Sequence, residues 1–197
     1  MKVIGLTGSS GSGKSTVSAL LQEHGFYIID CDRVAREVLR PGTDCLRRIF
    51  ACFGPAVQNE NGTLNRRALA GIVFAEPEKL RQLDKIMYPQ ITADILDILK
   101  ECQNRGEAFA VLDAPTLFES GADALCDCVV SVLSDDTLRI KRIMERDRLT
   151  SEEAQKRLSS QQSNAFYEDK SDFVIQNSGS LEALKNEAAA LVQKLMK

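Results

Sequence analysis

The sequence predicts an α/β fold in which five parallel β-strands form a sheet with helices on both faces. Two observations support this prediction. Short apolar runs alternate along the chain with segments of helical periodicity, which is the pattern of a parallel sheet covered by helices. A glycine-rich segment directly follows the first apolar run, as in P-loop NTPases. The candidate strands are residues 3–6, 26–29, 108–112, 129–133 and 173–175.

The first and last helical segments are clearly bounded in the sequence. Residues 15–24 should form a helix that ends at Gly25, because glycine adopts the left-handed conformation that closes many helices. The last segment carries apolar residues at helical spacing, which predicts one buried face. That face comprises Leu181, Leu184, Ala188, Leu191, Val192 and Leu195.

Two longer segments exceed what a minimal sheet needs. Residues 43–100 form a mainly helical insertion, in which Pro77 can start a helix and Pro89 should break or kink one. Residues 136–170 contain two charged helices, and Thr150 and Glu153 have capping-box spacing at the start of the second. Because such insertions build substrate sites and lids, we expect a helical acceptor insertion and a helical lid within one domain, residues 1–197.

The composition argues against several classes of function. The 197 residues suffice for one well-formed core but are few for two full domains. A formal net charge of −3 gives no basic field for nucleic acid or an anionic membrane, and no apolar stretch approaches transmembrane length. The first residues lack the apolar run of a signal peptide. We therefore expect a cytoplasmic monomer or weak homo-oligomer whose partners are small molecules.

The six cysteines predict reduced thiols. They form no Cys-x-x-Cys pair, and the single histidine, His24, cannot complete a zinc-finger set. We interpret them mainly as small core residues, with a redox role for Cys126 and Cys128 as the alternative.

The glycine-rich segment predicts a phosphate-binding loop. Residues 8–15 are Gly-Ser-Ser-Gly-Ser-Gly-Lys-Ser and match Gly-x-x-x-x-Gly-Lys-Ser/Thr without a gap. Glycines let the backbone curl so that the N–H groups of successive residues, Gly11, Ser12 and Gly13 among them, point into one concavity. The positive end of the following helix adds to their field.

Three side chains after this loop extend the prediction to ATP and Mg²⁺. Lys14 can span the β- and γ-phosphates, the Ser15 hydroxyl can bind Mg²⁺, and Thr16 can touch the α-phosphate. The alternatives are a chance match and a switch GTPase. Because the sequence lacks the Asn-Lys-x-Asp motif of GTPases, a kinase is favoured.

Carboxylates follow the second and third strands. Asp30 and Asp32 lie at the edge where open α/β sheets bind ligands, so Asp32 is a candidate general base and Asp30 a residue that orders the turn. The alternative is that Asp32 only caps the next helix and Asp30 solvates the turn, since the spacing predicts that one of the two is a cap. Asp113 ends the third strand, where P-loop proteins hold Mg²⁺ or its water. The alternative for Asp113 is a turn residue before Pro115.

Nearly the whole chain resembles the dephospho-CoA kinase family. The shared motifs occur in the family's order, from the first strand to the segment after the last. They are residues 4–8 with the phosphate loop, 30–32, 41–42, 62–67, 72–74, 113–119, 146–150 with Glu153, Ala154, Arg157 and Gln161, and 172–179. The resemblance implies that ATP phosphorylates the 3′-hydroxyl of dephospho-CoA, the last step of coenzyme A synthesis. It also implies a nucleotide-kinase-like sheet with the first strand at its centre.

The chain departs from the family pattern at few positions. Ser9 and Ser10 stand where the family often has Gly-Ile, and Cys31 replaces an alanine. Thr116 replaces a leucine, and Tyr88 precedes Pro89 where a His-Pro pair is usual. Tyr88 is therefore expected to hold the acceptor by stacking or through its hydroxyl, and the alternative is that the site is shifted.

Arginines on one predicted helix are candidate phosphate ligands. Arg139, Arg142 and Arg146 share this helix, and Arg142 and Arg146 share a face. The resemblance makes this segment the lid, so Arg142 and Arg146 are candidate catalytic residues. The alternative is a solvated basic face. Asn177, after the last strand, could recognise the adenine edge, with a simple loop turn as the alternative.

The acceptor site requires cations, because dephospho-CoA carries a pyrophosphate. Arg66 and Arg81 in the helical insertion are candidates, together with Arg67. The aromatic residues of the insertion are expected mainly to pack its helices. They are Phe50, Phe53, Phe74 and Tyr88. A kinase for another small hydroxyl or for a nucleoside monophosphate is the alternative enzyme, and a nucleotide switch is the alternative outside enzymes.

Overall fold

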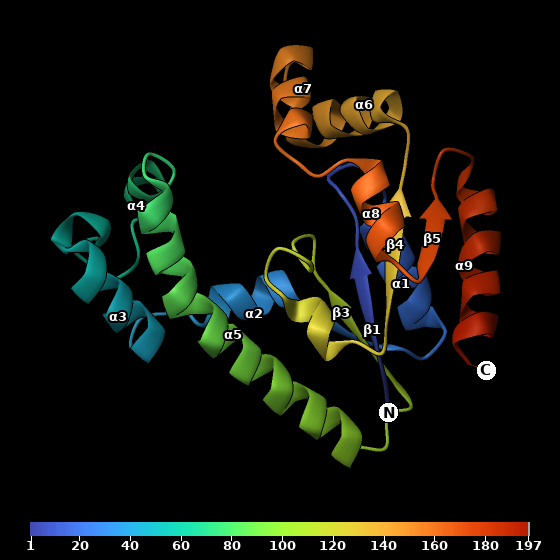
Figure 1. Ribbon diagram of the computed structural model, residues 1–197, viewed down its shortest axis with the longest axis horizontal. Coiled ribbons are helices and arrows are strands. Elements are labelled where there is room, and N and C mark those ends of the chain that lie inside the picture. The colour runs from blue at the N-terminus through green and yellow to red at the C-terminus, as the bar shows by residue number, and fades with distance from the viewer. Residues whose placement is uncertain (197) are drawn as a thin grey trace. The chain divides into compact units, whose positions relative to one another are not determined.

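The structure, a computed structural model, describes residues 1–196 and contains the predicted five-stranded sheet (Figure 1). Its strand order is β2-β3-β1-β4-β5, which confirms that the strand before the phosphate loop is central. The pairs β1–β3, β1–β4 and β4–β5 are parallel. The strands are β1 Lys2–Thr7, β2 Tyr27–Asp30, β3 Phe109–Asp113, β4 Cys128–Leu133 and β5 Phe173–Gln176. All five match the predicted apolar runs within one or two residues.

The chain forms two compact units. The first comprises Met1–Ile29 and Cys102–Lys197 and holds the sheet apart from the last residue of β2, and the second is Asp30–Glu101. Within residues 1–196, no helix combines the length and the apolar composition that crossing a membrane requires.

The core of the first unit lies against the two central strands. Ile4 and Leu6 of β1 and Val130 of β4 have no exposed surface. Helix α1, Lys14–Glu23, and helix α9, Leu181–Leu195, contribute apolar side chains to the same core. Gly25, with φ of 85°, follows the end of α1 and confirms the predicted stop.

The predicted buried face of α9 is correct except at its first residue. Leu184, Ala188, Leu191, Val192 and Leu195 are buried, but Leu181 is 59% exposed. Leu181 is the first residue of the helix, directly after the capping residue Ser180, whose side chain accepts a hydrogen bond from the Ala183 N–H. Helical spacing alone could not show that the buried face of α9 begins one turn later, at Leu184.

Residues 136–170 form three helices, so the prediction of two was wrong. They are α6 Asp136–Asp147, α7 Ser151–Ser159 and α8 Asn164–Lys170. The capping box of Thr150 and Glu153 at the start of α7 is confirmed. Helix α8 contacts β4, in front of which it lies in Figure 1, so it belongs to the layer that covers the sheet.

The second unit is helical and has its own core. It contains α2 Cys31–Glu37, α3 Asp44–Phe53, α4 Arg66–Val73 and most of α5 Pro77–Asn104. Helix α5 begins at Pro77 as predicted, but it continues through Pro89, so the prediction of a break there was wrong. Phe50 and Phe53 pack against the core, as expected, whereas Phe74 is 78% exposed. The fully or nearly buried side chains of this core include Cys45, Leu46, Ile49 and Val57.

The two leucines of α9 provide a matched test of this packing. We expect Leu184→Ala to lower the free energy of unfolding by about 2–5 kcal/mol, because it leaves a cavity beneath the helix. Leu181→Ala, on the same helix but exposed, should change it by less than about 0.5 kcal/mol. Urea unfolding of both variants measures the difference. Equal effects would contradict the assignment of the buried face.

Candidate active site

The loop between β1 and α1 has the backbone shape of a phosphate-binding loop. Gly8, Gly11 and Gly13 have φ values of 145°, 79° and 94°, which disfavour other residues. A Cβ atom at Gly8 would overlap the carbonyl oxygen of Val132, and one at Gly13 would overlap the side-chain amide of Asn177. These two glycines therefore permit both the dihedral angles and the close approach of neighbouring segments.

The start of α1 completes the cradle. Lys14 is the first residue of the helix and follows Gly13, which provides no side-chain cap. Within residues 1–196, the backbone N–H groups of Gly11, Gly13, Lys14 and Ser15 have no protein acceptor, whereas those of Ser12 and Thr16 donate to Ser9 O and Gly13 O. Uncapped donors at the positive end of a helix suit a phosphate. The predicted cofactor residues from Gly11 to Thr16 are thus brought together in one loop and helix turn.

Lys14 and Asp113 are brought into contact by the register of the sheet. Leu6 of β1 pairs with Asp113 of β3, so the end of β3 lies beside the start of the loop. The Lys14 ammonium and the Asp113 carboxylate form an ion pair, in which the side chains are 19% and 14% exposed. The alternative in which Asp113 is only a turn residue does not account for this pair.

The arginines of α6 make different contacts. Arg142 donates to Gly11 O and Ser134 Oγ, each at 3.1 Å, and to Asn177 O at 3.2 Å. Arg146 is 57% exposed in its side chain and donates to Ser10 Oγ at 3.2 Å. The alternative of a solvated basic face therefore does not describe Arg142, which is bound to the phosphate loop.

Arg146 also belongs to an ionic cluster on the segment predicted as a lid. It donates to both carboxylate oxygens of Asp147 at 2.8 Å, and Arg157 donates to Asp147 at 2.6 Å. The hydrogen bond from Arg146 is the main cause of a lowered pKa at Asp147. The carboxylate therefore stays ionised and holds Arg146 beside the loop.

Two residues near the loop were underestimated in the sequence analysis. Arg139 is 2% exposed and its Nε donates to Ser10 O at 3.2 Å. Asn177 is 7% exposed and its Nδ2 donates to Ser12 O at 2.7 Å. The spacing of three residues between Arg139 and Arg142 places both near one helix face and could have included Arg139 in the site. No sequence pattern would have shown that Asn177 reaches Ser12.

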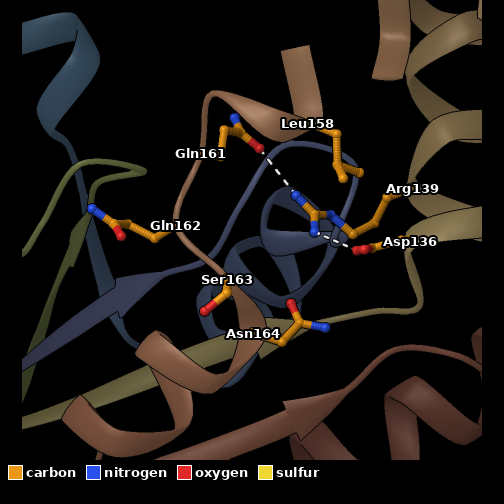
Figure 2. Close-up of a pocket in the computed structure, with 7 residues that line it drawn as sticks. All are labelled: Asp136, Arg139, Leu158, Gln161, Gln162, Ser163 and Asn164. Atoms are coloured by element: carbon orange, nitrogen blue, oxygen red, sulfur yellow. Dashed lines mark hydrogen bonds and ion pairs between the residues drawn. The ribbon is translucent and has the colours of Figure 1, made fainter. Parts of the chain in front are cut away.

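A pocket of about 240 Å³ lies next to Arg139. Figure 2 shows the guanidinium of Arg139 between Gln161 and Asp136, to which it donates at 3.0 and 2.8 Å. The remaining residues that line the pocket are Leu158, Gln162, Ser163 and Asn164.

The two carboxylates after β2 have different positions in the second unit. Asp30 caps α2, because its side chain accepts the Arg33 N–H at 2.9 Å. Asp32 lies in the first turn of that helix. The expectation that one of the two caps the helix is confirmed, but the cap is Asp30, so the alternative that assigned the cap to Asp32 was wrong.

The predicted acceptor residues lie on two helices of the second unit, with Arg66 on α4 and both Arg81 and Tyr88 on α5. Arg66 is the first residue of α4, and Arg81 on α5 forms an exposed ion pair with Glu78. Tyr88 hydrogen-bonds to Asp84, whose pKa is nevertheless raised because burial outweighs this bond. A pocket of about 470 Å³ in this unit contains none of these three, and is lined by Arg33, Val34, Glu37, Arg40, Asp94, Asp97 and Ile98.

Comparison with known proteins identifies the family. The sequence model described as "Dephospho-CoA kinase" matches residues 2–183. The chain belongs to the dephospho-CoA kinase family. The dephospho-CoA kinase of Listeria monocytogenes is 39% identical over 196 residues, which cover 100% of this chain and 98% of the relative. That of Geobacillus kaustophilus is 40% identical, over 97% of this chain and 95% of the relative.

Solved structures agree with this membership. TT1252 from Thermus thermophilus has a TM-score of 0.85 and 31% identity, and covers 98% of this chain and 97% of its own. The dephospho-CoA kinase from Campylobacter jejuni has a TM-score of 0.73 and 31% identity, over 99% and 98% of the two chains. The shikimate kinase from Acinetobacter baumannii, at 17% identity and a TM-score of 0.56, shares the fold.

One departure from the dephospho-CoA kinase pattern has a structural role in this chain. Ser10, where the family often has isoleucine, accepts a hydrogen bond from Arg146 through its hydroxyl. Its backbone N–H donates to Gln161 Oε1 at 3.1 Å. The substitution therefore adds a polar contact between the phosphate loop and the α6–α8 segment.

A glycine pair tests the close packing around the loop. Gly13 and Gly25 have similar φ values, 94° and 85°, but a Cβ atom at Gly25 would meet nothing within 4 Å. We expect Gly25→Ala to lower the free energy of unfolding by about 1–2 kcal/mol through backbone strain alone. Gly13→Ala should cost about 1–3 kcal/mol more, because its methyl group overlaps Asn177. Chemical denaturation measures both, and equal losses would contradict the packing described here.

Proposed function

We propose that this chain transfers the γ-phosphate of ATP to the 3′-hydroxyl of dephospho-CoA and so produces coenzyme A. The observation that carries this proposal is the Lys14–Asp113 ion pair at the end of a complete phosphate loop, in a chain that belongs to the dephospho-CoA kinase family. Lys14 supplies a point charge for the β- and γ-phosphates, where negative charge develops during transfer. The loop N–H groups hold the same phosphates.

The residues beside the loop fit a magnesium ion. Mg²⁺ prefers oxygen ligands and usually binds to one or two protein groups together with phosphates and water. The Ser15 hydroxyl and the Asp113 carboxylate are groups of this kind. Among residues 1–196 no cluster of three or more His, Cys, Asp or Glu side chains is suited to a metal, which agrees with a site completed by the nucleotide. Ser15 and Asp113 would hold the ion, which would offset the negative charge of the phosphates during transfer.

The two lid arginines have different roles in this proposal. Arg146 is more than half exposed and is held by Asp147, so its guanidinium is available to the transferring phosphoryl group. Arg142 already donates to three acceptors around the loop. Residues 136–170 are proposed as a lid that covers bound ATP, and Arg146, near the end of α6, is the arginine that this lid presents to the phosphates.

Asp32 is proposed as the general base. Phosphoryl transfer needs a group that takes the proton of the attacking hydroxyl. Asp30 is the cap of α2, and Asp32 lies in the first turn of this helix, which directly follows β2. This edge of an α/β sheet is where ligands bind.

The acceptor is proposed to bind the helical insertion of residues 43–100. Arg66 and Arg81 would meet the pyrophosphate of dephospho-CoA, and Tyr88 would replace the usual histidine. To bind the pyrophosphate, Arg81 would have to leave Glu78. The ion pair between them is exposed and therefore weak. The cytoplasmic location and the monomeric or weakly oligomeric state stay predictions.

A panel of acceptors tests the proposed reaction. We expect ADP release to depend on dephospho-CoA, with nucleoside monophosphates and shikimate giving turnover near background. Lys14→Ala should abolish nearly all transfer while the protein stays folded, because the charge that stabilises the transition state is lost. Lys141→Ala, an exposed lysine of α6, is the matched control and should keep wild-type turnover. Unchanged turnover in Lys14→Ala would remove the loop from the mechanism.

Two neighbouring aspartates test the base. Asp32→Asn preserves shape but cannot accept a proton, so kcat should fall by about 10²–10⁴-fold with little change in ATP affinity. Asp30→Asn keeps a good N-cap and should have a much smaller effect on kcat. Steady-state kinetics with dephospho-CoA measures both. Near-normal kcat in Asp32→Asn would exclude Asp32 as the base.

A further inference from the structure

Three successive carbonyl groups of the phosphate loop are each held by a side chain from a distant part of the sequence. Two of these side chains come from α6 and one follows β5. Each donates a single hydrogen bond to one carbonyl oxygen. The contacts are Arg139 Nε to Ser10 O at 3.2 Å, Arg142 Nη1 to Gly11 O at 3.1 Å and Asn177 Nδ2 to Ser12 O at 2.7 Å.

The Asn177 contact is fixed to the sheet. The N–H of Asn177 donates to Leu133 O at 2.7 Å and so extends the pairing of β4 with β5. Its carbonyl oxygen accepts from Ser134 Oγ at 2.7 Å and from Arg142 at 3.2 Å. With both backbone groups bound and 7% of its surface exposed, Asn177 has little freedom to leave Ser12.

The Arg139 contact is fixed within the α6–α8 segment. Its guanidinium is held by Asp136 and by Gln161, as Figure 2 shows. The Gln161 Oε1 atom that receives Arg139 also receives the Ser10 N–H at 3.1 Å. The N–H of Ser10 is therefore bound by Gln161 and its C=O by Arg139, and these two side chains also bind each other.

These contacts determine the direction of the loop's donors. In a planar trans peptide, the C=O and the following N–H point in opposite directions. A carbonyl held at Ser10 or Ser12 therefore directs the N–H of Gly11 or Gly13 away from the holding side chain. Within residues 1–196 these two N–H groups have no protein acceptor, whereas the Ser12 N–H closes a turn on Ser9 O at 3.1 Å.

We propose that Arg139, Arg142 and Asn177 are positioning residues that orient the peptide groups of the phosphate loop before ATP binds. They act through the loop, and their contribution is to the binding of the phosphate chain. This assigns Asn177 a role different from recognition of adenine. The inference rests on the proposed binding of ATP by this loop.

The surroundings of Asn177 favour this role. Its amide nitrogen lies so close to Gly13 that a methyl group there would overlap it. An amide that is buried against the loop and donates to Ser12 O has little surface left for a nucleobase. Pre-organised donors improve binding because less ordering is required when the ligand arrives.

Inorganic tripolyphosphate separates the two roles, because it carries the phosphate chain without a base. Asn177→Asp keeps the shape of the side chain but replaces the amide donor by a carboxylate oxygen, which cannot donate to Ser12 O. We expect the affinities for ATP and for tripolyphosphate, measured by calorimetry with Mg²⁺, to fall by the same factor of about ten or more. An unchanged affinity for tripolyphosphate with weaker ATP binding would instead make Asn177 an adenine contact, and unchanged affinity for both ligands would also overturn the proposal.

Control variants separate positioning from folding. Asn186→Asp makes the same charge change at an exposed position of α9 and should leave both affinities at wild-type values. Arg139→Lys keeps the positive charge but loses the guanidinium geometry, and should weaken ATP and tripolyphosphate together at an unfolding midpoint near that of the wild type. If Asn177→Asp does not fold, Arg139→Lys decides between the same outcomes. Failure of the wild-type protein to bind ATP would refute the proposed function itself.

Discussion

The structure depends on a loop that must keep several backbone N–H groups unpaired until a ligand arrives. Backbone donors without a protein acceptor must stay within reach of water or a ligand, and Gly11, Gly13, Lys14 and Ser15 are all partly or fully exposed. Here the loop is prevented from satisfying its own donors by the left-handed glycines, by the helix that begins at Lys14 and by side chains that bind its carbonyl groups. The sheet supports all three, because the loop leaves its central strand.

The sheet also determines which groups meet at the loop. The parallel register of β1 with β3 brings Asp113 to Lys14, and the pairing of β4 with β5 brings Asn177 to Ser12. In both cases a residue just at the end of a strand makes the contact. The site therefore depends on the pairing register of these strands, and a shift of either pairing by one residue would separate these groups.

Features that depend on local sequence could be predicted, whereas those that depend on tertiary contacts could not. The five strands, the loop and the capping box at Thr150 follow from patterns of neighbouring residues, as does the presence of a helix cap after β2, although not the choice of Asp30 over Asp32. The helix through Pro89 and the exposed Leu181 and Phe74 do not, because burial is decided by segments distant in sequence. The same limit explains Arg139 and Asn177, whose partners in the phosphate loop lie more than 100 residues away in the chain.

The ion pair between Lys14 and Asp113 has a thermodynamic consequence for ligand binding. A phosphate that attracts the lysine releases the carboxylate, and a cation that attracts the carboxylate releases the lysine. Each ligand therefore removes a competitor of the other, and by reciprocity the two affinities rise by the same factor. Nucleotide and metal ion would then be taken up as one cooperative unit, and either of them alone would bind against the attraction of an intact pair.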